Sequence, residues 1–383
     1  MPLLLVGLLA VSVLADGASA SNPVAMKQVP AVAATRQASD DSEQPPTPEQ
    51  KAASATYQNY MRSLVHSLRT SADARDRALA TQMSFMIDFF DTHEPTGADR
   101  AAHGAMLRGA AEAAPDDALV QWLWASASPE DSGCNPSSPC PRRVEAVARL
   151  QPDNGSAWLP VFNTAWKAND TAAAESALAQ MALAKLFDEQ FGMALKAWMD
   201  VYRRYPMPKS VIARNSPEAT FDDQTRNFAW SMAFAAAVAT PAYQSLLKAC
   251  SREKHPDDSP LRFRDCAQVG RLMLTQSTSL LSSRIGRAVL RVSGHATAVD
   301  IANARAADWQ YEHWQTLVLG RTDYDVSDLK ATAVDWLDTG DETQVMRRRL
   351  QRAGIPLTPP ADWQPRGRNG KPISPLGESP PAK

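Results

Sequence analysis

Apolar residues recur at helical spacing through most of this chain, and that periodicity restricts its fold more than any other feature. Between Tyr57 and Leu68 they fall three or four residues apart, the spacing that places them on one face of an α-helix. Comparable patterns recur over 79–90, 191–202 and 281–292, whereas the alternation typical of a β-strand occurs only in short ambiguous runs. The periodicity predicts an all-α protein.

Proline and capping residues divide the helical pattern into two regions. Thr47-Pro48-Glu49 begins the first, because it combines a capping hydroxyl, a proline at the first helical position and an acidic first turn. Three prolines within residues 206–221 interrupt the pattern, since proline neither continues a helix nor donates a backbone hydrogen bond. We therefore expect helical regions over 47–205 and 222–355, joined by a proline-containing connection.

A proline-acid turn followed by a tryptophan occurs twice in the first region. Pro115-Asp116-Asp117 precedes Trp122, and Pro152-Asp153-Asn154 precedes Trp158. The two copies lie about 36 residues apart, within the range of helix-pair repeats. The spacing predicts paired helices in this part of the chain.

The block from Trp158 to Asp188 resembles a degenerate tetratricopeptide repeat. A bulky residue opens its first helix, and the small residues Ala165 and Ala174 stand where the two helices of such a repeat approach closely. The block departs from the family pattern at Phe162, where glycine or alanine is usual, and it lacks the proline that usually ends the second helix. The resemblance extends over residues 97–205. It implies stacked helical hairpins, as in an α-solenoid, with a concave face for a protein or peptide partner, and it carries over no catalytic residue.

Both ends of the chain differ in composition from the helical part. Pro2–Leu14 is an apolar run too short to span a bilayer, and Ala18-Ser19-Ala20 supplies the small residues that precede a signal-peptidase cut. We therefore predict a cleaved signal peptide over 1–20, a flexible polar leader over 21–46, and export to the periplasm, with secretion as the alternative. Residues 356–383 are rich in proline and glycine, which predicts a disordered tail. We expect no membrane-spanning segment after signal cleavage.

The four cysteines favour export as well. They allow three pairings, of which the local ones, Cys134 with Cys140 and Cys250 with Cys266, are the simplest. A zinc site would need a closely spaced cysteine pair with further ligands at matching spacing, and neither pair provides this. Free buried cysteines are the alternative if the protein is not exported. We expect two structural disulfides.

Charge and motifs argue against several classes of function. The formal net charge of −2 argues against a general nucleic-acid binder, because such proteins carry a basic excess. His93-Glu94 lacks the second histidine of a zinc-protease motif, and the sequence contains neither a phosphate-binding loop after a strand nor a Gly-x-Ser-x-Gly elbow. We predict no catalytic residue, no cofactor and no metal site.

Aromatic residues mark the candidate contact sites of the second region. In the segment Asp308–Trp314, helical spacing places Trp309 and His313 on one face and Tyr311 and Trp314 on another. Such stripes usually pack in a core. An aromatic groove with an imidazole and carboxylates can instead hold a ligand or a protein partner.

Trp158, Trp166 and Trp198 are the corresponding candidates in the repeat-like region, although each could equally belong to the core. The sequence favours an exported, non-enzymatic helical protein that mediates protein–protein interaction or scaffolding in the cell envelope. The first alternative is a binding module for a small apolar or envelope-derived ligand near Trp309 and His313. The second is an envelope enzyme whose site the motifs do not identify.

Overall fold

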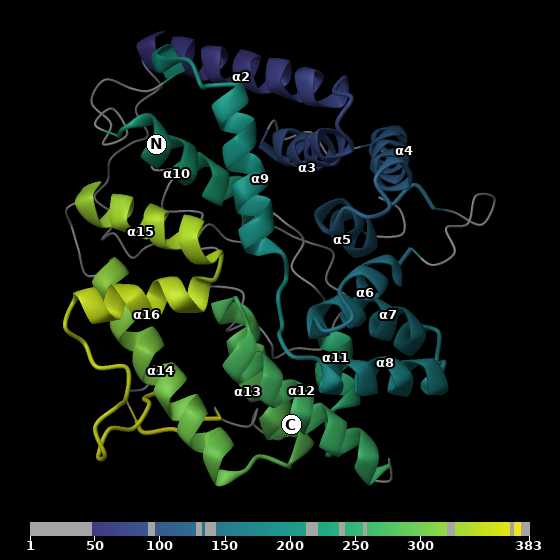
Figure 1. Ribbon diagram of the computed structural model, residues 1–383, viewed down its shortest axis with the longest axis vertical. Helices are drawn as coiled ribbons and strands as arrows, with labels where there is room; N and C mark the ends of the chain where they lie inside the picture. The colour runs from purple at the N-terminus through teal and green to yellow at the C-terminus, as the bar shows by residue number, and fades with distance from the viewer. Residues whose placement is uncertain are drawn as a thin grey trace.

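The computed structural model describes residues 48–90, 96–127, 132–134, 143–211, 221–236, 242–255, 259–319, 326–367 and 371–376. Within them every regular element is a helix, and β-pairing is limited to isolated bridges. The all-α prediction is confirmed (Figure 1). The predicted signal peptide and leader, and also Cys140, lie outside the described residues. The pairing of Cys134 with Cys140 therefore stays a prediction.

The helices follow one another through mostly short connections. In chain order they are α2 (Pro48–Arg69), α3 (Ala74–Phe90), α4 (Gly97–Ala113), α5 (Ala118–Ser126), α6 (Ala146–Leu150), α7 (Gly155–Lys167), α8 (Thr171–Leu183), α9 (Phe191–Arg204), the 3-10 helix η1 (Lys209–Val211), α10 (Asp223–Ala235), α11 (Gln244–Ala249), α12 (Pro260–Gln276), α13 (Leu280–Ser293), α14 (Ala298–Leu319), α15 (Val326–Thr339) and α16 (Glu342–Arg352).

Local sequence explains where many of these helices begin and end. Thr96 and Asp99 form a capping box at the start of α4, in which each side chain accepts a hydrogen bond from the other residue's backbone N–H. Asn154 caps α7 by accepting from the Ser156 N–H at 3.2 Å. Gly294, with a φ of 70°, ends α13 as the sequence predicts, because a side chain would strain that backbone conformation.

The first hydrophobic core surrounds α9 (Figure 1). The side chain of Trp198 on α9 is fully buried, and its ring centroid lies 4.9 Å from that of Phe234 on α10. Phe191, at the start of α9, packs against Trp336 of α15 with the ring centroids 5.1 Å apart. Residues of α2 to α5 complete this core. Helices on both sides of the connection over 206–221 therefore share one core.

An ion pair joins α3 to α9 at the edge of this core. The Arg204 guanidinium donates from Nη1 and Nη2 to the two carboxylate oxygens of Asp76, at 2.7 and 2.6 Å. Burial raises the pKa of Asp76, but the hydrogen bonds outweigh it and hold the pKa below its usual value. The two residues are 128 positions apart in the chain. In a solenoid each structural unit contacts mainly its neighbours in the chain. A contact between residues so far apart is not typical of that architecture, so the predicted stack of hairpins stays unconfirmed.

The second hydrophobic core lies between α7, α8, α11, α12 and α13. α7 and α8 pack side by side, with the small side chains of Ala165, Ala174 and Ala177 buried. This part of the chain thus contains a helix pair of the kind that the repeat spacing predicts.

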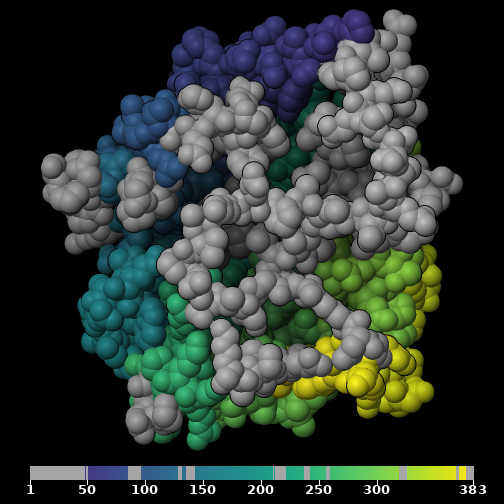
Figure 2. Space-filling model, turned by 180° about the vertical axis from the view of Figure 1, so that it is seen from behind, coloured from purple at the N-terminus to yellow at the C-terminus, as the bar shows by residue number. Residues whose placement is uncertain are grey.

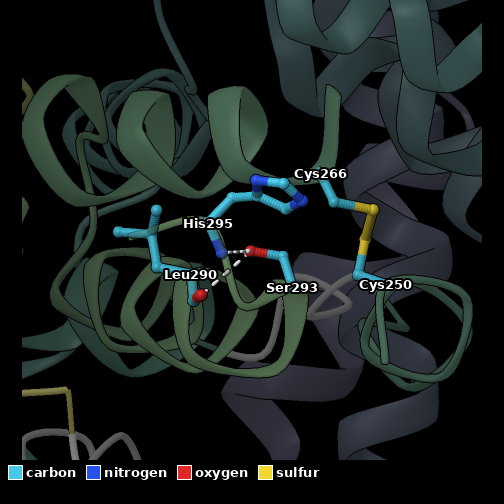
Figure 3. Close-up of a disulfide and its surroundings, with 5 residues drawn as sticks. All are labelled: Cys250, Cys266, Leu290, Ser293 and His295. Carbon is cyan, nitrogen blue, oxygen red and sulfur yellow. Dashed lines mark hydrogen bonds between the residues drawn. A yellow bond between two sulfur atoms is a disulfide. The ribbon is translucent and has the colours of Figure 1, made fainter. Parts of the chain in front are cut away.

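The Cys250–Cys266 disulfide ties the end of α11 to α12 and confirms one of the two predicted pairings. It lies beside the C-terminal end of α13 (Figure 3). There the Ser293 hydroxyl donates to the Leu290 carbonyl oxygen at 2.9 Å. The cross-link therefore holds α11 against α12, and the end of α13 lies next to it.

α12 and α13 cross where two glycines meet. A Cβ atom added to Gly286 would lie 2.7 Å from the carbonyl oxygen of Gly270. One added to Gly270 would lie 2.8 Å from the side chain of Leu290. Real side-chain carbons do not approach backbone so closely, so this crossing requires glycine.

The segment after α16 is not the free tail that its composition predicts. We call residues 355–367 and 371–376 the tail segment. It runs back along α14 (Figure 1), and the yellow C-terminal residues lie against the green helices in the space-filling view (Figure 2). Two of its prolines, Pro359 and Pro365, are buried. Proline density correctly predicts the lack of helix here, but side chains of α13 and α14 hold the segment in place.

Candidate functional site

The structure distributes the predicted contact tryptophans between the core and the surface. Trp198 is fully buried, and its Nε1 donates to Gln82 Oε1 at 3.3 Å. This corrects the prediction that Trp198 contacts a partner, because a side chain enclosed in the core cannot touch one. Trp158 and Trp166 are half-buried on α7, and Trp166 stacks on Phe162 with the ring centroids 6.0 Å apart. Their role as partner contacts stays a prediction.

The aromatic segment of α14 has the two faces that helical spacing predicts. On one face, Trp314 is buried in a cluster with Leu280 and Met346. Tyr311 packs beside this cluster, and the Arg284 guanidinium lies 4.6 Å from the centroid of its ring. This face therefore belongs largely to the packing between α13, α14 and α16.

Trp309 and His313 form the other face, which meets the tail segment. Trp309 Nε1 donates to the Pro356 carbonyl oxygen at 2.7 Å, and its ring meets that of Trp363 edge-on with centroids 5.4 Å apart. His313 Nδ1 is hydrogen-bonded to the Trp309 carbonyl oxygen at 2.9 Å, and the two rings lie 3.7 Å apart. His313 thus supports Trp309, and Trp309 makes the contact.

Five side chains of α13 and α14 donate to backbone carbonyl oxygens of the tail segment, and the bond from Arg287 to Pro375 is the longest, at 3.5 Å. We call the other four the docking face: Arg291, Arg305, Trp309 and Gln310. Arg305 donates to the carbonyl oxygens of Pro360, Ala361 and Trp363, the last two at 3.0 and 2.8 Å. Each of the other three donates to one further carbonyl oxygen, at 2.7 to 2.9 Å.

These contacts recognise the backbone more than a particular sequence. The segment has a turn at 361–362, where the Trp363 N–H donates to the Pro360 carbonyl oxygen at 3.2 Å. Because it forms no helix, many of its carbonyl oxygens need donors from other elements. Arginine offers five N–H donors, and Arg305 uses this capacity for three carbonyl groups. The buried Pro359 and Pro365 and the half-buried Trp363 add side-chain anchors. The docking face therefore holds the proline-containing tail segment mainly through its backbone carbonyl groups.

A small pocket lies beside α14, and residues of α12, α13 and α16 also line it; it shares Gln310 with the docking face. Its charged lining residues are Arg284, Arg287, Asp308 and Arg347. Arg287 forms an ion pair with Asp308. Burial raises the pKa of Asp308, and the positive charges of Arg287 and Arg284 oppose that rise. Trp309 and His313, beside which a small-ligand site is predicted, do not line this pocket.

Carboxyl groups gather where α9, α13 and α16 begin. Glu189 is buried and accepts hydrogen bonds from the Tyr243 and Ser282 hydroxyls, and burial raises its pKa. Glu342 accepts from the Leu280 N–H at 2.8 Å. Burial raises the pKa of Glu342 to about 7, aided by the negative charge of Glu189 and opposed by that hydrogen bond. These hydrogen bonds join helices of the protein to one another, so the cluster serves packing.

Comparison with known proteins finds no relative of this chain. The fold and the site define an all-α protein with a disulfide and with its own tail segment bound on α13 and α14. No protein-family model, no curated protein and no solved structure matches the chain. Among the residues that the structure describes, no three metal-ligating side chains gather in one place. None of the described helices is both long and apolar enough to cross a membrane.

Sequence analysis missed the arginines of both the docking face and the pocket. Arg284, Arg287 and Arg291 are spaced three and four residues apart, so helical periodicity places them on one face of their helix. Arg305 precedes Trp309 by four residues and shares its face. That spacing is a usable signal of a basic surface beside the aromatic segment, but it does not reveal the groups that the arginines bind.

Proposed function

We propose that this protein is an exported, non-enzymatic binding protein that docks a proline-containing peptide on the face formed by α13 and α14. The tail segment carries the proposal, because it lies on this face in the way that a bound peptide would. Arg305 is the central residue, since it donates to three carbonyl groups of the segment. The interaction surface is thus a helical face, as the sequence favours, but in the second helical region.

The chemistry of the contact supports a peptide as the ligand class. Proline restricts the backbone of the free chain, so docking costs a proline-rich peptide less conformational entropy than it costs other peptides. Arginine, glutamine and indole N–H groups supply donors for carbonyl oxygens, and the side chains of Pro359, Trp363 and Pro365 supply the apolar contacts. Such recognition needs neither a cofactor nor a catalytic group.

A partner peptide and the tail segment would compete for the same donors. Because the tail segment is tethered to the domain it binds, its effective concentration is high, on the order of millimolar for a short flexible connection. A free peptide therefore binds weakly unless it has greater affinity or the tail segment is loosened. The tail segment would then act as an internal competitor.

Two further parts of the proposal rest on other observations. Export is supported by the predicted signal peptide over 1–20 and by the Cys250–Cys266 disulfide, a cross-link typical of oxidising compartments. The mature protein should begin at Ser21, and a chain that keeps Met1 in the cytosol would contradict export. The tetratricopeptide-like region over 97–205 is proposed as a second contact surface, supported by the partial exposure of its tryptophans Trp158 and Trp166.

Loosening the tail segment tests the proposal while the docking face stays intact. Trp363→Ala, made in the full chain, removes the aromatic anchor of the tail segment and leaves Arg305 in place. A fluorescein-labelled peptide with the sequence of residues 355–376 should bind this variant more tightly than the wild-type protein in fluorescence anisotropy. We expect a gain of about five-fold, because an edge-on aromatic contact contributes about 1 kcal/mol.

Two further variants complete the test. Adding Arg305→Ala to Trp363→Ala should abolish the gain, because the main donor is lost. Asp362→Ala, at an exposed position of the tail segment, is the matched control and should bind the peptide as the wild-type protein does. Equal binding of the peptide to all four proteins would contradict docking on this face, as would binding that survives the loss of Arg305.

A further inference from the structure

Three arginine side chains meet at the pocket beside α14. Arg284 and Arg287 lie three residues apart on α13 and so share a face, and Arg347 enters the pocket from α16. Ser283 and Thr343 also line the pocket, but their hydroxyls donate to oxygen atoms of the protein. The arginines therefore supply the positive charge and the donors of the pocket.

The positive charge of the pocket is only partly neutralised. Arg287 pairs with Asp308, a carboxylate of the lining. Arg347 donates from Nε to Gln310 Oε1 at 3.3 Å, and Arg284 lies over an aromatic ring. Neither contact removes a charge. Within the part of the chain that the structure describes, neither Arg284 nor Arg347 forms an ion pair.

The carboxyl group next to the pocket does not compensate for this excess. Glu342 precedes the lining residue Thr343, but its carboxyl accepts a hydrogen bond from the Leu280 N–H at 2.8 Å. Burial also raises the pKa of Glu342, so part of the population is uncharged at neutral pH. The pocket lining thus contains three guanidinium groups and one carboxylate, that of Asp308, which is already paired with Arg287.

We propose that this pocket binds a phosphate group, either free phosphate or the phosphate ester of a small molecule. Guanidinium groups present paired N–H donors that match the oxygen atoms of a phosphate. The inference rests on Arg284 and Arg347, whereas peptide docking depends mainly on Arg305. The two sites share Gln310, and Arg287 also donates to the Pro375 carbonyl oxygen at 3.5 Å.

Titration calorimetry on the full chain tests the site directly. Inorganic phosphate and glycerol 3-phosphate are the probes, with acetate as a second anion and ionic strength held constant with sodium chloride. Wild-type protein should bind both phosphate probes with a stoichiometry near one. Tighter binding of glycerol 3-phosphate would identify a phosphate ester as the ligand, and binding of inorganic phosphate alone would identify the free anion.

Variants separate the pocket from general anion effects. Arg284→Gln combined with Arg347→Gln should lower the affinity about ten-fold or more, because charge-assisted hydrogen bonds are lost. Arg264→Gln, which removes an arginine with 73% of its side chain exposed, is the matched control and should bind as the wild-type protein does. Arg347→Lys keeps the charge but loses the paired donors. Its affinity for phosphate should therefore lie between those of the wild-type protein and the double variant.

Three results would overturn the proposal. The first is the lack of saturable phosphate binding to the wild-type protein. The second is an equal affinity of the double variant and the control, provided that circular dichroism shows both to be folded. The third is tighter binding of acetate than of either phosphate probe.

Discussion

The carboxyl group of Glu342 gives the folding free energy a pH dependence that one substitution can test. The pKa of this group rises from an ordinary value of 4.5 to about 7 in the folded protein. Between these pH values the folded chain holds a proton that the unfolded chain has released. The free energy of unfolding therefore falls as the pH rises from about 4.5 to 7, and the loss is complete above pH 7.

The size of the effect follows from the difference between the two pKa values. One pH unit corresponds to about 1.4 kcal/mol, so the difference sets an upper limit of about 3 kcal/mol. Part of the Glu342 side chain remains exposed, and water there reduces the penalty on the charged form. We expect a loss of about 1 to 2 kcal/mol between pH 5 and pH 8.

Glu342→Gln isolates this contribution. Glutamine keeps an acceptor oxygen for the Leu280 N–H and cannot ionise, so it imitates the protonated carboxyl. In urea denaturation followed by tryptophan fluorescence, the variant should exceed wild type by about 1 to 2 kcal/mol at pH 8 and by much less at pH 5. Glu253→Gln, at an exposed position, is the control and should follow wild type at every pH. A variant less stable than wild type at pH 8 would refute the reasoning, since the charged carboxylate would then be stabilising.

Three further predictions concern packing, cross-linking and charge. Gly286→Ala should lower the free energy of unfolding by about 1 to 3 kcal/mol, because its Cβ would lie 2.7 Å from a carbonyl oxygen of α12. Gly109→Ala, where the Cβ would meet no atom within 4 Å, should instead stabilise α4 by about 0.5 to 1 kcal/mol, and equal effects of the two changes would contradict the glycine crossing. Replacing Cys250 and Cys266 by serine should lower the free energy of unfolding by about 3 kcal/mol under oxidising conditions. If the variant and the wild-type protein still differed in dithiothreitol, that difference would not come from the disulfide. Arg204→Met should lower the free energy of unfolding at pH 7, measured in urea, by about 3 kcal/mol, because it leaves the buried carboxylate of Asp76 unpaired. A loss below 1 kcal/mol would show that the ion pair contributes little to stability.

Features of this protein that depend on neighbouring residues could be predicted from the sequence. Helical class follows from apolar spacing, which is a property of each segment alone. Gly294 ends α13 and Asn154 caps α7 because the groups involved lie within a few residues of each other. The Cys250–Cys266 disulfide spans only 16 positions, so proximity in the chain favours it over the alternatives.

Features that depend on distant residues required the tertiary structure. Trp158 and Trp198 occur in similar helical patterns, yet only Trp198 is enclosed, because α10 supplies the ring that packs against it. Proline density shows that the tail segment forms no helix, but its docking depends on donors such as Arg305, 58 positions from the carbonyl group of Trp363. The pocket likewise needs side chains from α13, α14 and α16 together. Amino-acid spacing reveals which face of a helix a side chain occupies, whereas the packing of whole helices decides what that face meets.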